Sequence, residues 1–396
     1  MRRRRYQNPA GGTDAPVDDR IDLAHQSVSW AVREMCCRIG IDSASFARAA
    51  ANLDRVGQRK LSDQTLRQVV ESEGRAVLAW QDHEQLELDF DAGGGTTTAT
   101  ADGRAMTRLY VGIDGFMLPM ITDAEVGKRF EKAKGRRRRL KPKRGVRRLP
   151  LVRGRGANQR YKEFKRVTMD DQDQRHPLMR VTRHGPDRAG KMLRGMAEEV
   201  RLHRVQQVVA VTEGAEWIAG LIDRNLPKAK TTALLDFYHA AEPVHPTRRI
   251  VYGEENPQGQ PWAKGLIDAM VERPFESGWD ERLEERRRVR SPAQRKSLDG
   301  LMHDLLTRRE KMDSVGCKSR GLPIGSGPTE SGCKSASRRL KGPGMRWTGS
   351  NAEAMVGLES LHQSNLWSTY WQSRLNPSYA LAPAQKKFWR VDRPWR

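Results

Sequence analysis

The sequence predicts a mixed α/β protein in which an all-helical region precedes a sheet-forming core. Three observations predict this class. Apolar residues recur at helical spacing in the first 90 residues, a glycine- and threonine-rich break follows at residues 91–100, and strand-like apolar runs begin after it. Because domains run roughly 100 to 200 residues, a chain of 396 residues should contain more than one such region.

The first 90 residues predict three helices. Apolar residues at helical spacing predict the first over residues 21–39. Ser43 is predicted to cap the second, which should end at Gly57, and Ser62 is predicted to begin the third. Two helices joined by a short glycine-bearing turn are typical of a helix-turn-helix-like DNA-binding region. Any three-helix bundle gives the same pattern, so a purely structural role is the alternative.

The third helix should be amphipathic. Its pattern turns Leu66, Val69 and Val70 toward the core and leaves Arg67 and Glu71 to solvent. Arg67 is therefore a candidate DNA contact.

A strand predicted over residues 108–121 begins the core after a linker at 91–104. Its apolar run is interrupted by one acid, Asp114. A carboxylate in such a run is costly unless it is paired or holds a cation, so Asp114 is a candidate metal ligand. A turn aspartate before Gly115 is the alternative.

The rest of the core alternates predicted strands and helices. The strands are expected at residues 160–169, 178–182, 208–212 and 232–239, and the helices at 187–207 and 216–225. The last two strands deliver Glu213, Asp236 and His239 at their ends. This order is typical of an RNase H-like sheet, in which acids from separate strands converge on divalent metal.

A charged, strand-free stretch over residues 244–320 predicts a helical insertion, and Glu330 then begins a helix that brings a further acid. The predicted organisation is a DNA-binding region (1–90), a linker (91–104), the first part of the core (105–245), the insertion (246–321), the last core helix (322–365) and a carboxyl-terminal tail (366–396).

The charge predicts a polyanionic partner. Lys and Arg number 72 against 49 Asp and Glu, which gives a net charge of +23. Nineteen of the basic residues and only two acids lie in a basic arm at 128–166, a local charge of +17. A solvated tract without a ligand is the alternative. Seven residues of the arm are candidate phosphate contacts: Arg136, Arg137, Arg138, Arg139, Lys141, Lys143 and Arg144.

Several protein classes are excluded by composition. The four cysteines form no CxxC pair, so their spacing encodes neither a disulfide scaffold nor a zinc module. No apolar run reaches the roughly 18 residues of a membrane span. We expect a cytoplasmic protein.

Four stretches resemble a known family. They are GAEWI (214–218), LLDFYHAAE (234–242), GSGPTESGCK (325–334) and RRLKGPGMRW (338–347). They resemble bacterial insertion-sequence DDE transposases of the ISKra group, within the Mutator-like supergroup, and the matches keep their order from Val111 to Leu361. The resemblance implies an RNase H-like core with a helical insertion and an acid triad that binds two Mg²⁺ ions, for which Mn²⁺ can substitute.

The resemblance also assigns the acids. Asp114 matches the first and Glu330 the last, while Asp236 and His239 match the D-x-x-H signature that follows the second acid. Where the family has Asp, this chain has Glu213, which is one methylene longer. Asp236 is the alternative second ligand, so the candidate catalytic and metal-binding residues are Asp114, Glu213, Asp236 and Glu330.

The expected function is that of a DNA transposase that acts on transposon ends and target DNA, as a homo-oligomer associated with the bacterial nucleoid. His239, Lys334 and Arg338 are candidate phosphate contacts, with surface or packing roles as alternatives. Trp347 is a candidate for stacking an unpaired base, with a core position as the alternative. The alternative functions are a catalytically silent DNA-binding protein derived from a transposase and a nuclease on the same fold.

Overall fold

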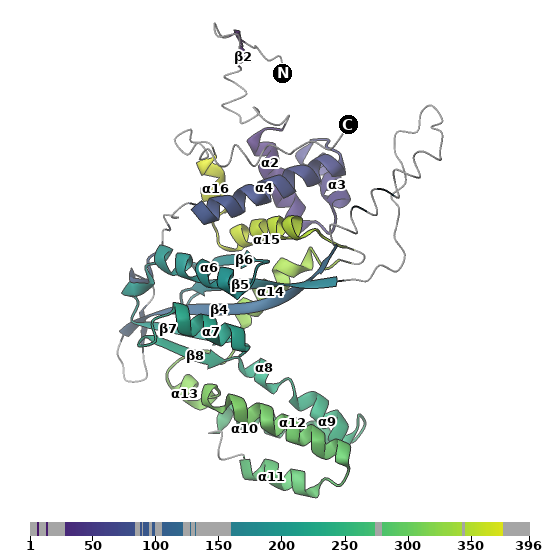
Figure 1. Ribbon diagram of the computed structural model, residues 1–396, viewed down its shortest axis with the longest axis vertical. Helices are drawn as coiled ribbons and strands as arrows, with labels where there is room; N and C mark the ends of the chain where they lie inside the picture. The colour runs from purple at the N-terminus through teal and green to yellow at the C-terminus, as the bar shows by residue number, and fades with distance from the viewer. Residues whose placement is uncertain are drawn as a thin grey trace. The chain divides into compact units, whose positions relative to one another are not determined.

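The computed structural model in Figure 1 describes most of the helical and strand-forming parts of the chain. The described residues are 6–7, 13–14, 28–83, 88, 90–94, 97–99, 105–121, 127, 131, 160–273, 279–342 and 345–374. The short strands β1 (Tyr6–Gln7) and β2 (Thr13–Asp14) pair with each other antiparallel.

The protein is a mixed α/β structure. Its described residues form a six-stranded sheet, in which five strands lie side by side and the sixth pairs with one of these five. The strands are β3 (Thr97–Ala99), β4 (Ala105–Met120), β5 (Arg160–Asp170), β6 (Leu178–Thr182), β7 (Gln207–Thr212) and β8 (Thr231–Leu235). They lie in the order β6-β5-β4-β7-β8, and β3 pairs with the start of β4. β7 is parallel to both β4 and β8, and β6 is antiparallel to β5.

The pairing of β4 with β5 is antiparallel. The Thr168 hydroxyl donates to the Gly112 carbonyl at 3.3 Å, and the Tyr110 hydroxyl donates to Gln172 at 3.4 Å. Positions thus fall along one strand as they rise along the other. The long central strand β4 therefore has an antiparallel neighbour on one side and a parallel neighbour on the other.

Helices cover both faces of the sheet. Successive strand residues point to opposite faces. On one face the Lys165 ammonium lies 4.5 Å from the ring centroid of Trp217, in α7 (Glu216–Asn225), and α7 packs beside α6 (Pro186–Glu199). On the other face the Thr168 and Thr329 hydroxyls are hydrogen-bonded at 3.2 Å. That contact places the start of α14 (Gly327–Arg338) against the centre of the sheet.

Every regular element that the structure describes between β8 and α14 is a helix, as the sequence predicts. The helices are α8 (Phe237–Ala241), α9 (Val244–Tyr252), α10 (Gly259–Glu272), α11 (Trp279–Arg288), α12 (Pro292–Arg308), η4 (Arg309–Lys311) and α13 (Ser314–Ser319). Leu235 at the end of β8 and Phe237 in α8 share one apolar cluster with Met270 and Leu305. The insertion is thus anchored by the strand that precedes it.

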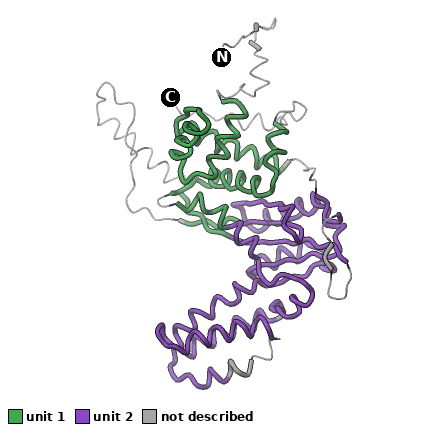
Figure 2. Tube along the Cα trace, turned by 180° about the vertical axis from the view of Figure 1, so that it is seen from behind, with its two compact units in different colours: residues 1–85, 116–164, 334–396 green, residues 86–115, 165–333 purple. Residues whose placement is uncertain are grey.

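The chain forms two compact units, coloured separately in Figure 2. One unit combines residues 1–85, 116–164 and 334–396, and the other combines residues 86–115 and 165–333. The acids Asp114, Glu213, Asp236 and Glu330 all belong to the second unit.

The first unit contains a helical bundle. Its helices are α2 (Trp30–Asp42), α3 (Phe46–Gly57), α4 (Asp63–His83), α15 (Gly349–Gln363) and α16 (Trp367–Ser373). A Cβ at Gly74 would lie 2.3 Å from the Ala354 carbonyl oxygen, so α4 and α15 approach closely at this glycine. The fully buried Glu73 accepts hydrogen bonds from Arg33 at 2.9 Å and from Tyr370 at 3.0 Å.

Some local predictions for the helical region are wrong. The cap of α3 is Ser45, whose hydroxyl accepts from the Arg48 N–H at 3.1 Å, whereas Ser43 ends α2. Glu71 is buried rather than exposed, and its carboxylate pairs with the Arg67 guanidinium at 2.7 Å. The Ser62 cap of α4 is confirmed by its hydrogen bond from the Thr65 N–H.

Other differences lie in the core. The helix predicted over 187–207 ends at Glu199 and is followed by η2 (Leu202–Arg204). The last predicted strand stops at Leu235 because Asp236 caps α8, so His239 lies on a helix. The predicted linker begins with η1 (Ala92–Gly94), which is held by a hydrogen bond from the Ala92 N–H to Val200 at 2.9 Å.

Among the helices of the described residues, none combines the length and the apolar character that crossing a membrane requires.

Candidate active site

Three acids lie in one row at the carboxyl edge of the parallel strands. The last paired rung joins Ile113 of β4 to Thr212 of β7, and Thr212 in turn to Leu235 of β8. Asp114, Glu213 and Asp236 are the next residues after these three, and the Asp236 N–H donates to the Thr212 carbonyl at 2.8 Å. Strand register therefore gathers acids that are far apart in the chain.

Asp114 lies among several charged and polar groups. Burial raises the pKa of its carboxyl group, and the nearby Glu330 raises it further. Hydrogen bonds from the Cys333 thiol and from the Gly115 N–H, the latter at 2.6 Å, oppose this shift, as does the charge of Arg166. A half-buried carboxylate is thus held between two donors, a cation and a second carboxylate.

α14 brings Glu330 to the row. The Glu330 N–H donates to the Ser326 carbonyl at 3.0 Å, which places this exposed side chain in the first turn of the helix. The helix begins three residues earlier than predicted, at Gly327. The sheet allows its approach because position 112 is glycine: a Cβ there would lie 1.8 Å from the Thr329 hydroxyl.

Cys333 lies one helical turn after Glu330 and faces the acids. Burial raises the pKa of its thiol well above the ordinary value, and the charges of Asp114 and Glu213 raise it further. Asp114 and Glu213 therefore both lie near this end of α14, the helix that also carries Glu330. The thiol stays protonated and serves as a hydrogen-bond donor to Asp114.

A fully buried arginine supports the same end of α14. Arg166 of β5 donates to the Met179 sulfur at 2.6 Å, and its guanidinium lies against Gly332. A Cβ at position 332 would be 1.9 Å from the nearest guanidinium nitrogen. The glycine between Glu330 and Cys333 therefore makes room for the cation that lies near Asp114.

Asp236 is in the row but is already saturated with hydrogen bonds. One carboxylate oxygen accepts from the N–H groups of Tyr238 at 2.7 Å and His239 at 3.1 Å. The other accepts from the Ser326 N–H at 2.7 Å and from the Ser326 hydroxyl. This buried residue thus ties α8 to the loop that leads into α14.

The donor set suits a hard divalent cation. Within the described ranges, no three Asp, Glu, His or Cys side chains already adopt a metal-ligand arrangement. The carboxylate oxygens of Asp114, Glu213 and Glu330 are the ligand type that Mg²⁺ prefers, and the repulsion between Asp114 and Glu330 is of the kind that a cation relieves.

The phosphate contacts predicted in the basic arm cannot be placed in the fold. All seven lie outside the described residues: Arg136, Arg137, Arg138, Arg139, Lys141, Lys143 and Arg144. Their contact with DNA stays a prediction.

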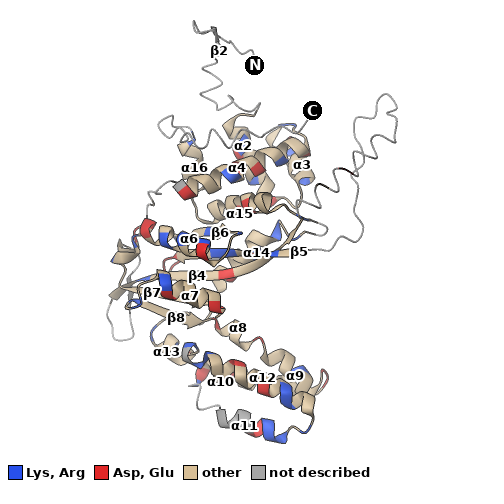
Figure 3. Cartoon of the chain, in the orientation of Figure 1, with Lys and Arg blue, Asp and Glu red and all other residues tan. Residues whose placement is uncertain are grey.

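The other predicted DNA contacts fall in different environments. Lys334 and Arg338 are exposed on α14, and Figure 3 shows how Lys and Arg are spread over the helices. His239 is partly exposed, with its Nδ1 atom 3.3 Å from the Glu242 carboxylate. Arg67 is exposed on α4, where its guanidinium pairs with Glu71.

Trp347 is buried in the first unit. Its ring N–H donates to the Leu340 carbonyl at 3.1 Å, and Phe46 packs edge-on at a centroid distance of 6.0 Å. The Arg339 guanidinium lies 5.6 Å from its ring centroid. Trp347 thus occupies a core position, which was the alternative interpretation of the sequence. Base stacking by Trp347 stays a prediction.

Sequence reasoning missed the residues that support the acids. Lys165 and Arg166 are counted in the predicted basic arm, but both are buried in β5. Cys333 and Gly332 lie inside a family-like stretch, where the spacing of Cys333 from Glu330 could have marked it as a residue of the same helix face.

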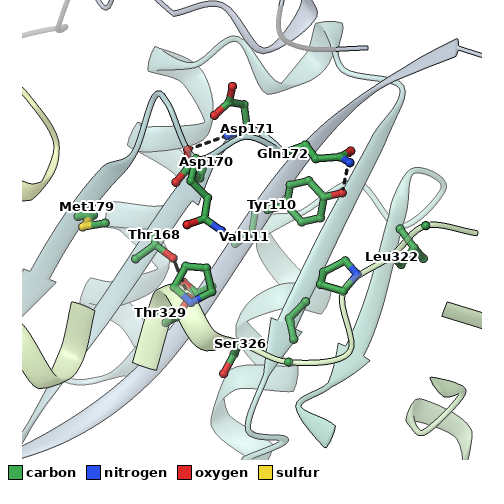
Figure 4. A pocket seen from close by; sticks show the side chains of 17 residues that line it. Tyr110, Val111, Thr168, Asp170, Asp171, Gln172, Met179, Leu322, Ser326 and Thr329 are labelled. Carbon is green, nitrogen blue, oxygen red and sulfur yellow. Dashed lines mark hydrogen bonds between the residues drawn. The ribbon is translucent and has the colours of Figure 1, made fainter. Parts of the chain in front are cut away.

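A pocket of about 360 Å³ opens beside the start of α14 (Figure 4). Thr168 and Thr329 meet at its wall, and Tyr110 reaches Gln172 across it. Asp170 also lines it. Burial, followed by the hydrogen bond and the charge of Asp171, raises the pKa of Asp170 to about 8.

Comparison with known proteins adds little. No protein-family model matches the chain, and no curated protein matches it. One similar solved structure is described as the Drosophila P element transposase strand transfer complex, with 10% sequence identity and a TM-score of 0.29. The match covers 91% of this chain and 86% of that one. A TM-score this low supports no inference about fold or function.

Proposed function

We propose that the protein is a DNA transposase that cleaves transposon ends and joins them to target DNA. The observation that carries the proposal is the row of Asp114, Glu213 and Asp236 with Glu330 beside it on α14. The strand order and directions are those expected of an RNase H-like sheet, and the family-like stretches include Glu330 and Asp236.

Asp114, Glu213 and Glu330 are the residues that would hold Mg²⁺. Two Mg²⁺ ions there would supply Lewis-acid polarisation of a phosphodiester and charge stabilisation of the attacking and leaving oxygens. Cys333 donates a hydrogen bond to Asp114, the charge of Arg166 favours the ionised form of Asp114, and Asp236 holds the loop that leads into α14. Cleavage and joining are both in-line phosphoryl transfers, so one such site serves both steps without a covalent protein intermediate.

The helices α2 and α3 are proposed to contact DNA. The three residues 43–45 join them, the turn length of a helix-turn-helix. Arg48 and Arg55, seven residues apart on α3, are both exposed, and Val56 beside them is 81% exposed. Arginines and a methyl-bearing side chain on one helix face are suited to the major groove, where they contact guanine edges and thymine methyls.

A strand-transfer assay tests the proposed function. The purified chain is incubated with labelled duplexes that carry the element's end sequence, target plasmid and Mg²⁺ or Mn²⁺. Products joined to the plasmid are the expected result. Nicked end DNA without joining would indicate the nuclease, and shifted but uncut DNA would indicate the silent DNA-binding protein. The matched control is Asp170→Asn, which alters a partly buried acid outside the row.

A further inference from the structure

Tyr238 is an exposed aromatic ring directly after the acid row. It is 66% exposed, and it and Tyr161 are the two aromatic residues among the exposed large hydrophobic side chains of the described residues. Only Tyr238 of this pair lies beside the acids, two residues after Asp236. A phenol ring in this place is well suited to contact a ligand that approaches the row.

The ring is fixed in position despite its exposure. A Cβ at Gly325 would lie 2.8 Å from the ring atom Cε2, so the ring rests on this glycine of the loop before α14. Phe237 packs edge-on against it at a centroid distance of 5.5 Å. The Tyr238 N–H bond to Asp236 fixes the backbone. Little ordering is therefore needed when a ligand stacks on the ring.

We propose that Tyr238 is a stacking platform for an unpaired nucleobase next to the phosphodiester held at the acid row. The proposal rests on the proposed function, because it takes DNA as the substrate. Aromatic stacking is tolerant of sequence and is available only to a base whose face is exposed. The platform therefore favours a frayed or single-stranded end over a closed duplex.

The neighbours of Tyr238 support a base rather than a phosphate as the group bound here. His239 lies beside the carboxylate of Glu242, and this carboxylate is well exposed. An exposed carboxylate repels phosphate, whereas the ring face attracts a base by dispersion. The α8 segment thus presents an aromatic surface beside an acid.

The experiment compares binding of two duplexes with the same sequence, one blunt and one with a short single-stranded tail that contains 2-aminopurine. Binding is measured with Ca²⁺ in place of Mg²⁺. Wild type is expected to prefer the tailed duplex and to quench the 2-aminopurine. Tyr238→Ala should lose roughly 5- to 140-fold of affinity for the tailed duplex, the equivalent of one stacked base, and keep its affinity for the blunt one.

Two variants serve as controls. Tyr238→Phe should behave like wild type, because the ring face is kept. Ile250→Ala, which shortens another exposed apolar side chain on α9, should also leave the preference intact. The inference is overturned if Tyr238→Ala still prefers the tailed duplex and quenches the base. Absence of binding to either duplex by wild type would instead overturn the proposed function.

Discussion

Two pairs of acids in the same unit differ in the groups that stabilise their carboxylates. Asp170 and Asp171 are adjacent in the chain, whereas Asp114 and Glu330 come from a central strand and a distant helix. Burial raises the pKa of one carboxyl group in each pair. The two pairs differ in which hydrogen-bond donors and cations stabilise the negative charge.

The Asp170–Asp171 pair is satisfied locally. The Asp171 carboxylate accepts from the N–H groups of Arg175 at 2.7 Å and His176 at 3.3 Å, and its own N–H donates to Asp170 at 2.9 Å. Burial alone would raise the pKa of Asp171, but hydrogen bonds from the Asp170 carboxyl and these N–H groups lower it overall. The two carboxyl groups are therefore stabilised by a proton that they share and by the N–H groups of a tight turn.

The Asp114–Glu330 pair is stabilised by groups that are distant in the sequence. Cys333 donates to Asp114 from α14, Arg166 acts on Asp114 through its charge from β5, and Glu330 remains exposed at the start of α14. Acids close in sequence are readily satisfied by the hydrogen bonds of a local turn. Acids gathered only by the fold are the better candidates for chemistry.

The largest expected effect separates the two pairs directly. Glu330→Gln or Asp114→Asn should lower DNA nicking by about 1,000-fold or more, because each removes several kcal/mol of metal-mediated stabilisation. Asp170→Asn should leave the nicking rate within about 3-fold, since it lies outside the row and small changes are typical away from the chemistry. Single-turnover nicking with Mn²⁺ measures all three. Comparable losses from Asp170→Asn would erase the distinction.

Variants of Glu213 and Asp236 distinguish a metal ligand from a positioning residue within the row. Glu213→Gln should abolish nicking, whereas Glu213→Asp should retain or raise it by restoring the ligand of the resembled family. Asp236→Asn should cost roughly 10- to 100-fold, as expected of a residue that positions others. Nicking rates and Mn²⁺-dependent melting shifts are the measurements. Normal nicking by Glu213→Gln with none by Asp236→Asn would reverse the two roles.

Gly332 tests the support behind Asp114. Gly332→Ala places a methyl group against the Arg166 guanidinium and should lower the free energy of unfolding by about 1–3 kcal/mol through overpacking. Gly300→Ala on α12 is the matched control, because apart from its chain neighbours and the nearby backbone of its own helix, nothing lies within 4 Å of the added methyl group. Urea unfolding measures both. An unchanged midpoint for Gly332→Ala would mean that Arg166 moves away freely.

A further expected effect is a pH dependence of stability that Asp170 causes. Its pKa of about 8 in the folded chain exceeds the value of about 3.9 in an unfolded one. Its contribution to stability is therefore complete below about pH 4 and is lost as the pH rises through 8. Asp170→Asn should flatten the decline in unfolding free energy between about pH 5 and pH 8. Parallel slopes for wild type and variant, from urea unfolding across that range, would contradict the shared proton.

Part of the sheet was predictable because β6, β7 and β8 are short, mainly apolar runs. The predicted bounds of β6 and α7 are confirmed, and Asp114 lies on the central strand as expected. The predicted order of strands and helices, together with the family resemblance, suggested that these acids converge, and the rungs of the parallel strands align the acids that follow them.

Tertiary contacts account for most of what could not be predicted. Ser43 and Ser45 are equally good caps by residue type, and only the path of the turn selects Ser45. Arg166 sits in a basic run whose composition suggests a solvated arm, yet its side chain is fully buried. The bond from Cys333 to Asp114 joins residues that no local pattern connects.

The most direct test of a shared metal site is backbone cleavage by bound iron. Fe²⁺ replaces Mg²⁺, and ascorbate with peroxide generates hydroxyl radicals that cut the chain near the ion. Cuts are expected near Asp114, Glu213 and Glu330 together and not near Asp170. All three cuts should be lost in Glu330→Gln or with excess Mg²⁺. Cuts near only one of the three acids, or three cuts that persist in Glu330→Gln, would contradict a shared metal site.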